Sequence, residues 1–305
     1  MRILLTGSSG FLGGHLCTML HDQGHELTCS GREPIIPSPQ ERNIVVPDIA
    51  VYDLWDKVLA DIDVVIHCAG ISHGKENGES LFSVNSEGSR RLVAAAIASS
   101  VKRFIYISTV KVLGEKTLDA PFSNMSQPYP VDAYSASKLV AENLLVDAAS
   151  HSDMEYVVVR PTLIYGPGVK ANFLQLLRLA KIPLPLPLAS VDNRRDMIST
   201  SNLCDLISVC VDHPKAKNQI FLAADGCAYS LRELVTIMRE VFGRPSRLFP
   251  FPSQWLRYGL VLLGKRAIAD RLFDNLEVDI SHTTATLDWQ PKYTLEGTLR
   301  EMHIE

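Results

Sequence analysis

The residues of this chain best suited to chemistry are Tyr134 and Lys138, which lie four positions apart at the start of a segment typical of a helix. Residues at this spacing share one face of a helix, so a phenol would lie beside an ammonium. A free phenol has a pKa near ~10, and a neighbouring positive charge lowers it. The pair would then be suited to proton transfer to or from a carbonyl or an alcohol. The same spacing is also compatible with a surface lysine packed on an aromatic ring.

A glycine triplet near the N-terminus indicates a dinucleotide site. A short apolar strand runs into Gly7, Gly10 and Gly13, spaced G-x-x-G-x-x-G, and an amphipathic helix follows. The first glycine permits a tight turn, the second lets backbone approach a pyrophosphate, and the third lets the helix pack close to the strand. The pyrophosphate would lie at the positive end of that helix, beside Phe11 and Leu12.

An alternation of strands and helices predicts how these motifs are positioned. The predicted strands are 2–6, 25–29, 43–46, 63–67, 103–108 and 155–160, and the predicted helices are 11–23, 51–60, 79–99 and 133–149. Such alternation implies right-handed crossovers and a doubly wound parallel sheet covered on both faces. After Gly168 the pattern loosens around three prolines, and we predict helices at 171–181, 200–212, 231–241 and 255–275.

Several motifs in the same order resemble the extended short-chain dehydrogenase/reductase family. They are the glycine triplet, the Tyr134/Lys138 pair, Thr109 in the run 107–114, and the runs 160–168 and 278–289. The resemblance covers nearly the whole chain and is strongest to the branch that acts on nucleotide sugars, of the epimerase/dehydratase type. The segments 169–173 and 183–188 resemble those of 4-ketoreductases in bacterial O-antigen synthesis.

The resemblance implies an α/β, Rossmann-type fold with a smaller C-terminal substrate-binding lobe. Residues 1–168 would form the NAD(P)-binding domain, with a returning segment near 190–225 that includes the apolar run 219–223. Residues 169–305 would form most of the substrate lobe, and the cleft between the two parts would bind the substrate. The resemblance also implies a cytoplasmic enzyme and a homodimer formed through paired helices.

The end of the second strand distinguishes the two nicotinamide cofactors, because an acid there binds the ribose hydroxyl of NAD and an arginine accommodates the phosphate of NADP. The chain has Ser30 and Arg32 at this place and no acid at the expected position, although Glu33 is near. NADP(H) is therefore favoured, and NAD(H) is the alternative. The resemblance adds further cofactor contacts, which are Asp48, Ile49, Cys68, Ala69, Gly70, Asn85 and Pro161. Asp48 is equally compatible with a helix cap, and Asn85 with support of the active-site helix.

The resemblance assigns the chemical roles to Thr109, Tyr134 and Lys138. Tyr134 would transfer the proton, Thr109 would hydrogen-bond the reacting oxygen, and Lys138 would hold the nicotinamide ribose and lower the pKa of the tyrosine. Ser108 is a rival hydroxyl, but strand alternation would turn only one of the two toward the substrate. Dehydratases of this family have an Asp-Glu pair after the threonine, where this chain has Val110 and Lys111, so dehydration is disfavoured.

The resemblance also indicates residues for the substrate. Arg195 would bind the diphosphate, to which a guanidinium fork is suited, although a solvated basic residue is the alternative. Asn172 resembles a diphosphate-binding residue or a simple helix cap. His73 lies past the fourth strand and is a candidate sugar contact or a surface histidine. Arg271 is a further diphosphate candidate.

We therefore consider three functions, with a steroid-type or other small-alcohol dehydrogenase of the same family as a further alternative, against which Arg195 and Asn172 count because such substrates lack a diphosphate. The first is NADPH-dependent reduction of the C4 ketone of a UDP-4-keto-6-deoxy-N-acetylhexosamine, giving UDP-N-acetylquinovosamine or UDP-N-acetylfucosamine for lipopolysaccharide. The second is a UDP-sugar 4-epimerase with tightly bound NAD. The third is a non-catalytic dinucleotide-binding protein, because a fold alone does not establish a function.

The composition of the chain bears on four further classes of protein: those that bind nucleic acid, those that bind metal, disulfide-rich proteins and membrane proteins. The 305 residues are 46% hydrophobic with a net charge of −4, which gives no reason to expect nucleic acid as a partner. Six scattered cysteines without a C-x-x-C pair predict neither a metal site nor a disulfide framework. No apolar run approaches the ~20 residues that span a bilayer. The most apolar late segment, 255–263, is interpreted as a helix docked on the core, with a position on a membrane surface as the alternative.

Overall fold

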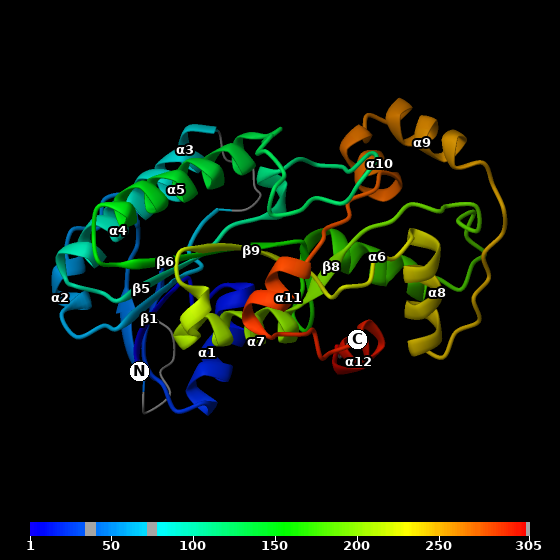
Figure 1. The fold of residues 1–305 in the computed structure, drawn as a ribbon. Helices are drawn as coiled ribbons and strands as arrows, with labels where there is room; N and C mark the ends of the chain where they lie inside the picture. The colour runs from blue at the N-terminus through cyan, green and yellow to red at the C-terminus, as the bar shows by residue number, and fades with distance from the viewer. Residues whose placement is uncertain (34–40, 72–77, 303–305) are drawn as a thin grey trace.

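The computed structural model describes residues 1–33, 41–71 and 78–302. A parallel sheet of seven strands, in the order β3-β2-β1-β4-β5-β6-β9, forms the centre of the larger part (Figure 1). The strands are β1 (Arg2–Thr6), β2 (Glu26–Gly31), β3 (Glu41–Val45), β4 (Val64–His67), β5 (Arg103–Ile107), β6 (Glu155–Pro161) and β9 (Gln219–Ala223). The prediction of a Rossmann-type parallel sheet is confirmed.

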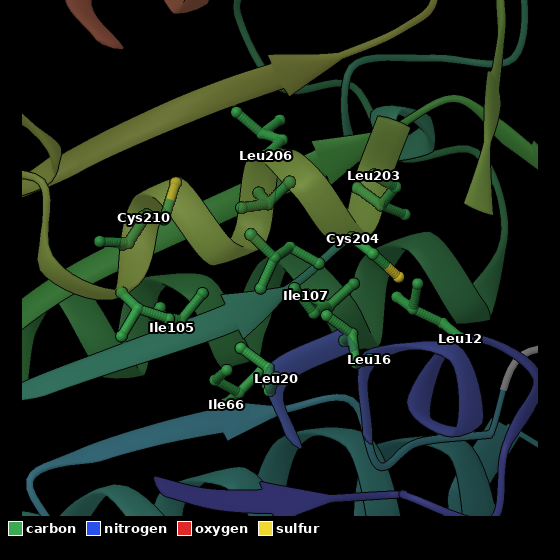
Figure 2. Packing of buried hydrophobic residues seen from close by; sticks show 14 of the residues in the cluster. Leu12, Leu16, Leu20, Ile66, Ile105, Ile107, Leu203, Cys204, Leu206 and Cys210 are labelled. Atoms are coloured by element: carbon green, nitrogen blue, oxygen red, sulfur yellow. The ribbon is translucent and has the colours of Figure 1, made fainter. Parts of the chain in front are cut away.

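Helices cover both faces of this sheet because its strands are apolar on both sides. On one face α1 (Phe11–Asp22) and α7 (Thr200–Asp212) bury leucines and cysteines against isoleucines of β4 and β5 (Figure 2). On the other face α2 (Trp55–Leu59), α4 (Ser89–Ala98) and α5 (Ala133–Ser150) pack against alternate strand residues. The segment that contains α7 and β9 thus returns to the large sheet.

A smaller lobe lies beyond the carboxyl ends of the strands (Figure 1). Its apolar cluster is built mainly from α6 (Ala171–Lys181), α8 (Leu231–Val241) and α12 (Leu295–Glu301). The short parallel strands β7 (Leu163–Tyr165) and β8 (Met197–Ser199) form a second sheet. The remaining helices are α9 (Ser253–Leu262), α10 (Arg266–Phe273) and α11 (Ser281–Leu287).

Three predicted helices differ from the observed ones. The predicted helix 51–60 is only α2, and 79–99 is α3 (Gly78–Phe82), a π-helical segment (Ser83–Gly88) and then α4. The predicted helix 255–275 is broken at Gly264, whose φ of 71° is left-handed and ends α9 before α10 begins. The strands β7 and β8 were not predicted, because three residues are too few to show a period.

The interpretation of 255–263 as a helix docked on the core is confirmed only in part, because Leu256 packs against the apolar cluster of the smaller lobe while most residues of the segment are exposed. None of the residues of α9 is buried. Among the described residues no helix is long and apolar enough to cross a membrane, and no group of acidic, histidine and cysteine side chains could hold a metal ion. No disulfide joins any of the six cysteines, all of which lie among the described residues.

Candidate active site

The glycine turn after β1 leaves no room for side chains, which is what a close approach to a dinucleotide requires. Gly7 has a left-handed φ of 71°, and a Cβ on it would lie 2.7 Å from the backbone nitrogen of Ala69. A Cβ on Gly13 would lie 2.1 Å from the carbonyl oxygen of Gly7. The residues present therefore fit a dinucleotide whose pyrophosphate lies at the N-terminus of α1.

A cavity of about 450 Å³ opens beside this turn and collects most of the predicted cofactor residues. Its lining includes Gly7, Gly10, Ser30, Arg32, Asp48, Ile49, Cys68, Ala69 and Gly70. One carboxylate oxygen of Asp48 accepts a hydrogen bond from the backbone of Ala50 at 2.9 Å, so a turn-capping role for this side chain is present.

Seven predicted cofactor residues lie outside that lining, and three of them, Asn85, Tyr134 and Lys138, are described below. Phe11, Leu12 and Gly13 form the first turn of α1, and the side chain of Leu12 is buried in the core. They can offer backbone N–H groups at the helix N-terminus. Pro161 lines a second cavity, described below, and not the first.

The role of the glycine turn can be tested with two neighbouring glycine variants, one of which serves as the control. Gly13→Ala should weaken NADPH binding by about 100-fold or more, because the new methyl group forces the turn away from the helix. Gly14→Ala is the matched control, since its Cβ would lie 3.8 Å from the nearest atom, a carbonyl oxygen of Ser8. Fluorescence titration with NADPH measures both. Equal affinities of the two variants would contradict the assignment of the turn.

The second cavity, of about 320 Å³, holds the predicted chemical residues. Thr109 caps a short 3-10 turn after β5, and Tyr134 lies in the first turn of α5, where Asp132 and Ser135 form a capping box. Thr109 and Tyr134 both line this cavity, and the Thr109 side chain acts to lower the pKa of the Tyr134 phenol. A carbonyl oxygen placed between these hydroxyls would meet a hydrogen-bond donor and a proton donor.

Ser108 and Thr109 both contribute atoms to the lining of this cavity, but the Ser108 hydroxyl is shielded, so the expectation that only one of the two hydroxyls faces the substrate stays a prediction. β5 ends at Ile107, so strand alternation no longer applies to the two residues that follow. The hydroxyl of Ser108 is buried and has no hydrogen-bond partner among the described residues.

The pKa of Tyr134 is raised in the structure, whereas the sequence predicted that it would be lowered. Burial, with the Asp132 carboxylate adding to it, raises the pKa of Tyr134 to about 12, and the Thr109 side chain acts in the opposite direction. Lys138 was expected to lower this pKa. The chain's own groups instead keep the phenol protonated at neutral pH, which is the form that donates a proton.

Lys138 is buried next to the dinucleotide cavity. Its ammonium lies 4.2 Å from the ring centroid of Tyr106 and 3.9 Å from where a Cβ on Gly70 would stand. Burial lowers the pKa of Lys138 to about 8, while Glu142, one turn further along α5, acts to raise it. The first two turns of α5 therefore connect the two cavities, with Tyr134 in one and Lys138 beside the other.

Asn85 lies in the π-helical segment and joins the cofactor loop to α5. Its side chain accepts a hydrogen bond from the backbone N–H of Ile71 at 2.8 Å, and donates to the Ile71 carbonyl at 3.0 Å and to the Ser137 hydroxyl at 2.9 Å. Ser137 immediately precedes Lys138. The geometry matches the expected support of the active-site helix, and π-helical turns are frequent at functional sites.

Sequence reasoning missed the role of His67, the last residue of β4. Ser89 donates to the Asn85 carbonyl at 2.6 Å, so its oxygen accepts from Nε2 of His67 at 2.9 Å. Nδ1 then accepts from Thr6 at 2.6 Å, because burial lowers the pKa of His67 to about 3 and keeps the ring neutral. This chain of hydrogen bonds links the end of β1, before the glycine turn, to Asn85. The signal available in the sequence was a polar residue, His67, at the end of an otherwise apolar strand.

A buried ion pair was also missed. The guanidinium of Arg160 in β6 binds the carboxylate of Glu142 in α5, with a shortest distance of 2.6 Å, and both side chains are almost fully buried. Glu142 follows Lys138 by four residues, so helix spacing alone places it on the lysine's face. The pair fixes α5 against the sheet at the level of the lysine.

Arg195 and Arg271 come from distant parts of the sequence and both line the cavity of Thr109 and Tyr134. Arg195 donates to the carbonyl of Asp274 at 3.0 Å, and burial lowers the pKa of its guanidinium. Two guanidinium groups in one cavity are suited to a diphosphate. His73 lies outside the described residues. Asn172 lies in the first turn of α6, and its side chain is outside the described residues.

The expectation that no acid follows Thr109 in the site is partly wrong. Lys111 lines the cavity, as expected for a chain without the dehydratase acids, but so does Glu115. The ammonium of Lys111 binds Glu115 at 2.6 Å and Asp132 at 3.4 Å. An acid is therefore present in the cavity, although the lysine pairs with it.

Comparison with known proteins identifies the family of this site. A sequence model described as "NAD dependent epimerase/dehydratase family" matches residues 3–224. A protein of Vibrio cholerae named UDP-glucose 4-epimerase is 42% identical over 98% of this chain and 93% of its own length. The chain belongs to the NAD dependent epimerase/dehydratase family. As a member of this family, it is an NAD(P)-dependent enzyme of the nucleotide-sugar epimerase and reductase type.

More distant members of the epimerase/dehydratase family include a reductase. GDP-6-deoxy-D-mannose reductase of Pseudomonas aeruginosa is 25% identical over 98% of this chain and 95% of its own length. The structure of UDP-glucuronic acid 4-epimerase from Bacillus cereus in complex with NAD has a TM-score of 0.79 and 21% identity, covering 99% of this chain and 97% of that one. At that identity the structural likeness shows the fold alone.

Proposed function

We propose that the chain reduces the C4 ketone of a UDP-4-keto-6-deoxy-N-acetylhexosamine with NADPH, giving UDP-N-acetylquinovosamine or UDP-N-acetylfucosamine for O-antigen synthesis. The observation that carries this proposal is the composition of the second cavity. Thr109 and Tyr134 share it with two arginines, while most of the remaining wall is apolar. The apolar residues are Val110, Leu163, Ile164, Phe173, Leu176, Met197, Leu231, Leu234, Leu272 and Leu276. Such a wall suits the methyl groups of a 6-deoxy, N-acetylated sugar.

In this reaction the protein positions the ketone and supplies the proton. The reduced nicotinamide supplies the hydride to C4 when it is bound. Tyr134 transfers its phenolic proton to the ketone oxygen, which becomes the C4 hydroxyl, and Thr109 holds that oxygen by a hydrogen bond. Arg195 and Arg271 bind the diphosphate and thereby orient the sugar.

The preference for NADPH rests on the ribose end of the first cavity. Arg32 and Ser30 line it, and Asp48 is the one carboxylate among its lining residues. One oxygen of Asp48 is already used by the backbone. An arginine at this place favours a 2′-phosphate over a free hydroxyl.

A UDP-sugar 4-epimerase is the second candidate, and the name of the 42% identical relative favours it. Such an enzyme oxidises and re-reduces C4 on tightly held NAD, so its tyrosine must first accept a proton. The same tyrosine would then return the proton, so what speaks against the epimerase is the first cavity, where Ser30 and Arg32 stand in place of the acid expected for NAD. A non-catalytic dinucleotide-binding protein is the third candidate, and the presence of Thr109, Tyr134 and Lys138 together argues against it.

Mixing the pure protein with UDP-4-keto-6-deoxy-N-acetylglucosamine and following NADPH and NADH absorbance tests these alternatives. We expect stoichiometric consumption, faster with NADPH. NMR of the product then gives its C4 configuration. Interconversion of UDP-hexoses by the protein with its own NAD, and no NADPH loss, would establish the epimerase.

The reduction should slow as the pH rises through about 8. Lys138 holds the ribose as an ammonium, and its lowered pKa of about 8 means that the charged form dominates only below that pH. Above it, kcat/KM should fall by up to about tenfold per pH unit, as expected for one required protonated group. A pH profile at saturating sugar nucleotide measures this. A rate that stays constant to pH 10 would show that the charge of Lys138 is not needed.

Two further parts of the proposal concern the setting of the enzyme. We propose a homodimer formed through paired helices, as the family resemblance implies, and sedimentation of the pure protein tests it. We also propose a cytoplasmic location, where NADPH and UDP-linked sugars are supplied.

A further inference from the structure

Helix α9 presents an apolar face to solvent. Trp255, Tyr258 and Leu262 follow one another at intervals of three and four residues, and their exposed fractions are 68%, 64% and 87%. Leu263, directly after the helix, is 72% exposed. Residues at this spacing share one helix face. Figure 1 shows α9 at the periphery of the smaller lobe.

This face is a fixed surface. Arg257, on the same helix, binds Asp270 at 2.6 Å and Asp274 at 2.7 Å, which ties α9 to α10. Phe249 and Phe251, in the strand-like approach to the helix, are also exposed. We call Phe249, Phe251, Trp255, Tyr258, Leu262 and Leu263 the aromatic face.

The charge around the aromatic face is mainly positive, since the two carboxylates beside it, Asp270 and Asp274, are outnumbered by basic groups. Between Glu240 and Asp270 the chain contains no acidic residue and five basic ones, although the whole chain has a net charge of −4. Four of the five are exposed: Arg244, Arg247, Lys265 and Arg266. A surface that combines exposed apolar side chains with unbalanced positive charge complements an anionic partner.

We propose that the aromatic face docks the enzyme on an anionic lipid bilayer, with α9 lying in the plane of the interface. Trp and Tyr are the side chains enriched at that depth, where their rings are buried and their polar ends remain hydrated. A second copy of the chain fits less well, because a two-fold interface would bring the same basic groups together, and the nearby acids Asp270 and Asp274 are already paired within the chain. The proposal is independent of the sugar that the enzyme reduces.

Tryptophan fluorescence tests the docking directly. Of the three tryptophans, Trp55 and Trp289 are buried and Trp255 is exposed, so a blue shift on adding vesicles reports on the aromatic face. We expect the shift, and co-sedimentation, with vesicles of phosphatidylglycerol and phosphatidylcholine. Pure phosphatidylcholine vesicles should bind about tenfold more weakly, and added salt should reduce binding to the anionic ones.

Variants separate the apolar contribution to vesicle binding from the electrostatic contribution. Leu262→Glu should weaken binding by about tenfold or more, and Lys265→Glu with Arg266→Glu should abolish the preference for anionic vesicles. Met125→Glu is the control, since Met125 is 86% exposed and lies outside this segment. All three proteins should retain the turnover of the unmodified enzyme without vesicles. Vesicle binding that Leu262→Glu leaves unchanged would overturn the proposal. A shift from dimer to monomer in Leu262→Glu, with no vesicle binding by the parent, would identify a second copy as the partner instead.

Discussion

Tyr134→Phe should lower turnover by about 100- to 10,000-fold, the range that a positioned proton donor contributes. The variant removes one oxygen and leaves the helix cap formed by Asp132 and Ser135 unchanged, so the cavity and the fold should be retained. The hydroxyl of Thr109 would remain, but it cannot replace a phenol as an acid because its pKa is far higher. Steady-state rates with the keto sugar nucleotide measure the loss.

The affinity for NADPH distinguishes a catalytic from a structural effect. It should change by less than about twofold, because Tyr134 lines the second cavity and not the first. Tyr129→Phe is the matched control, since Tyr129 is 74% exposed and precedes the same helix. Near-normal turnover in Tyr134→Phe would show that another group supplies the proton.

Arg160→Met should destabilise the protein by about 3–5 kcal/mol, the cost of leaving one partner of a buried ion pair uncompensated. The side chains of Arg160 and Glu142 are 6% and 2% exposed, so water cannot replace the lost partner. Urea denaturation followed by circular dichroism measures the free energy of unfolding.

A double variant distinguishes the cost of an unpaired buried charge from the contribution of the ion pair itself. Adding Glu142→Leu to Arg160→Met should restore much of the loss, because two apolar side chains of suitable volume can replace a buried pair. Arg90→Met is the control, because its pair with Glu87 is exposed and worth at most about 1 kcal/mol. A small loss in Arg160→Met would show that the buried carboxylate takes up a proton or finds another partner.

The sequence contained enough to predict the parts of the site that depend on local spacing. The glycine turn, the helix that carries Tyr134 and Lys138, and the parallel strands all follow from short-range patterns. The predicted sheet and the family were both confirmed by the structure and the comparisons. The positions of Thr109 and Tyr134 in one cavity followed from the resemblance, because they lie 25 residues apart in the sequence.

Features that depend on three-dimensional convergence could not be predicted. In the sequence His67 is only the last residue of a buried strand. Its role depends on hydrogen bonds to Thr6 and Ser89, which the fold brings to the two nitrogens of its ring. The pKa of Tyr134 depends on burial, which spacing does not reveal, and so its direction was wrong. The helix break at Gly264 and the exposure of α9 depend on what the smaller lobe leaves uncovered.

The most direct test of the proposed reaction is the fate of a label at the nicotinamide. The protein should be incubated with UDP-4-keto-6-deoxy-N-acetylglucosamine and NADPH carrying deuterium at the transferable position, and the product analysed by NMR. We predict one deuterium at C4 of the sugar for each NADPH oxidised. A product without deuterium at C4, or UDP-hexose interconversion that needs no added cofactor, would contradict the reductase and favour the epimerase.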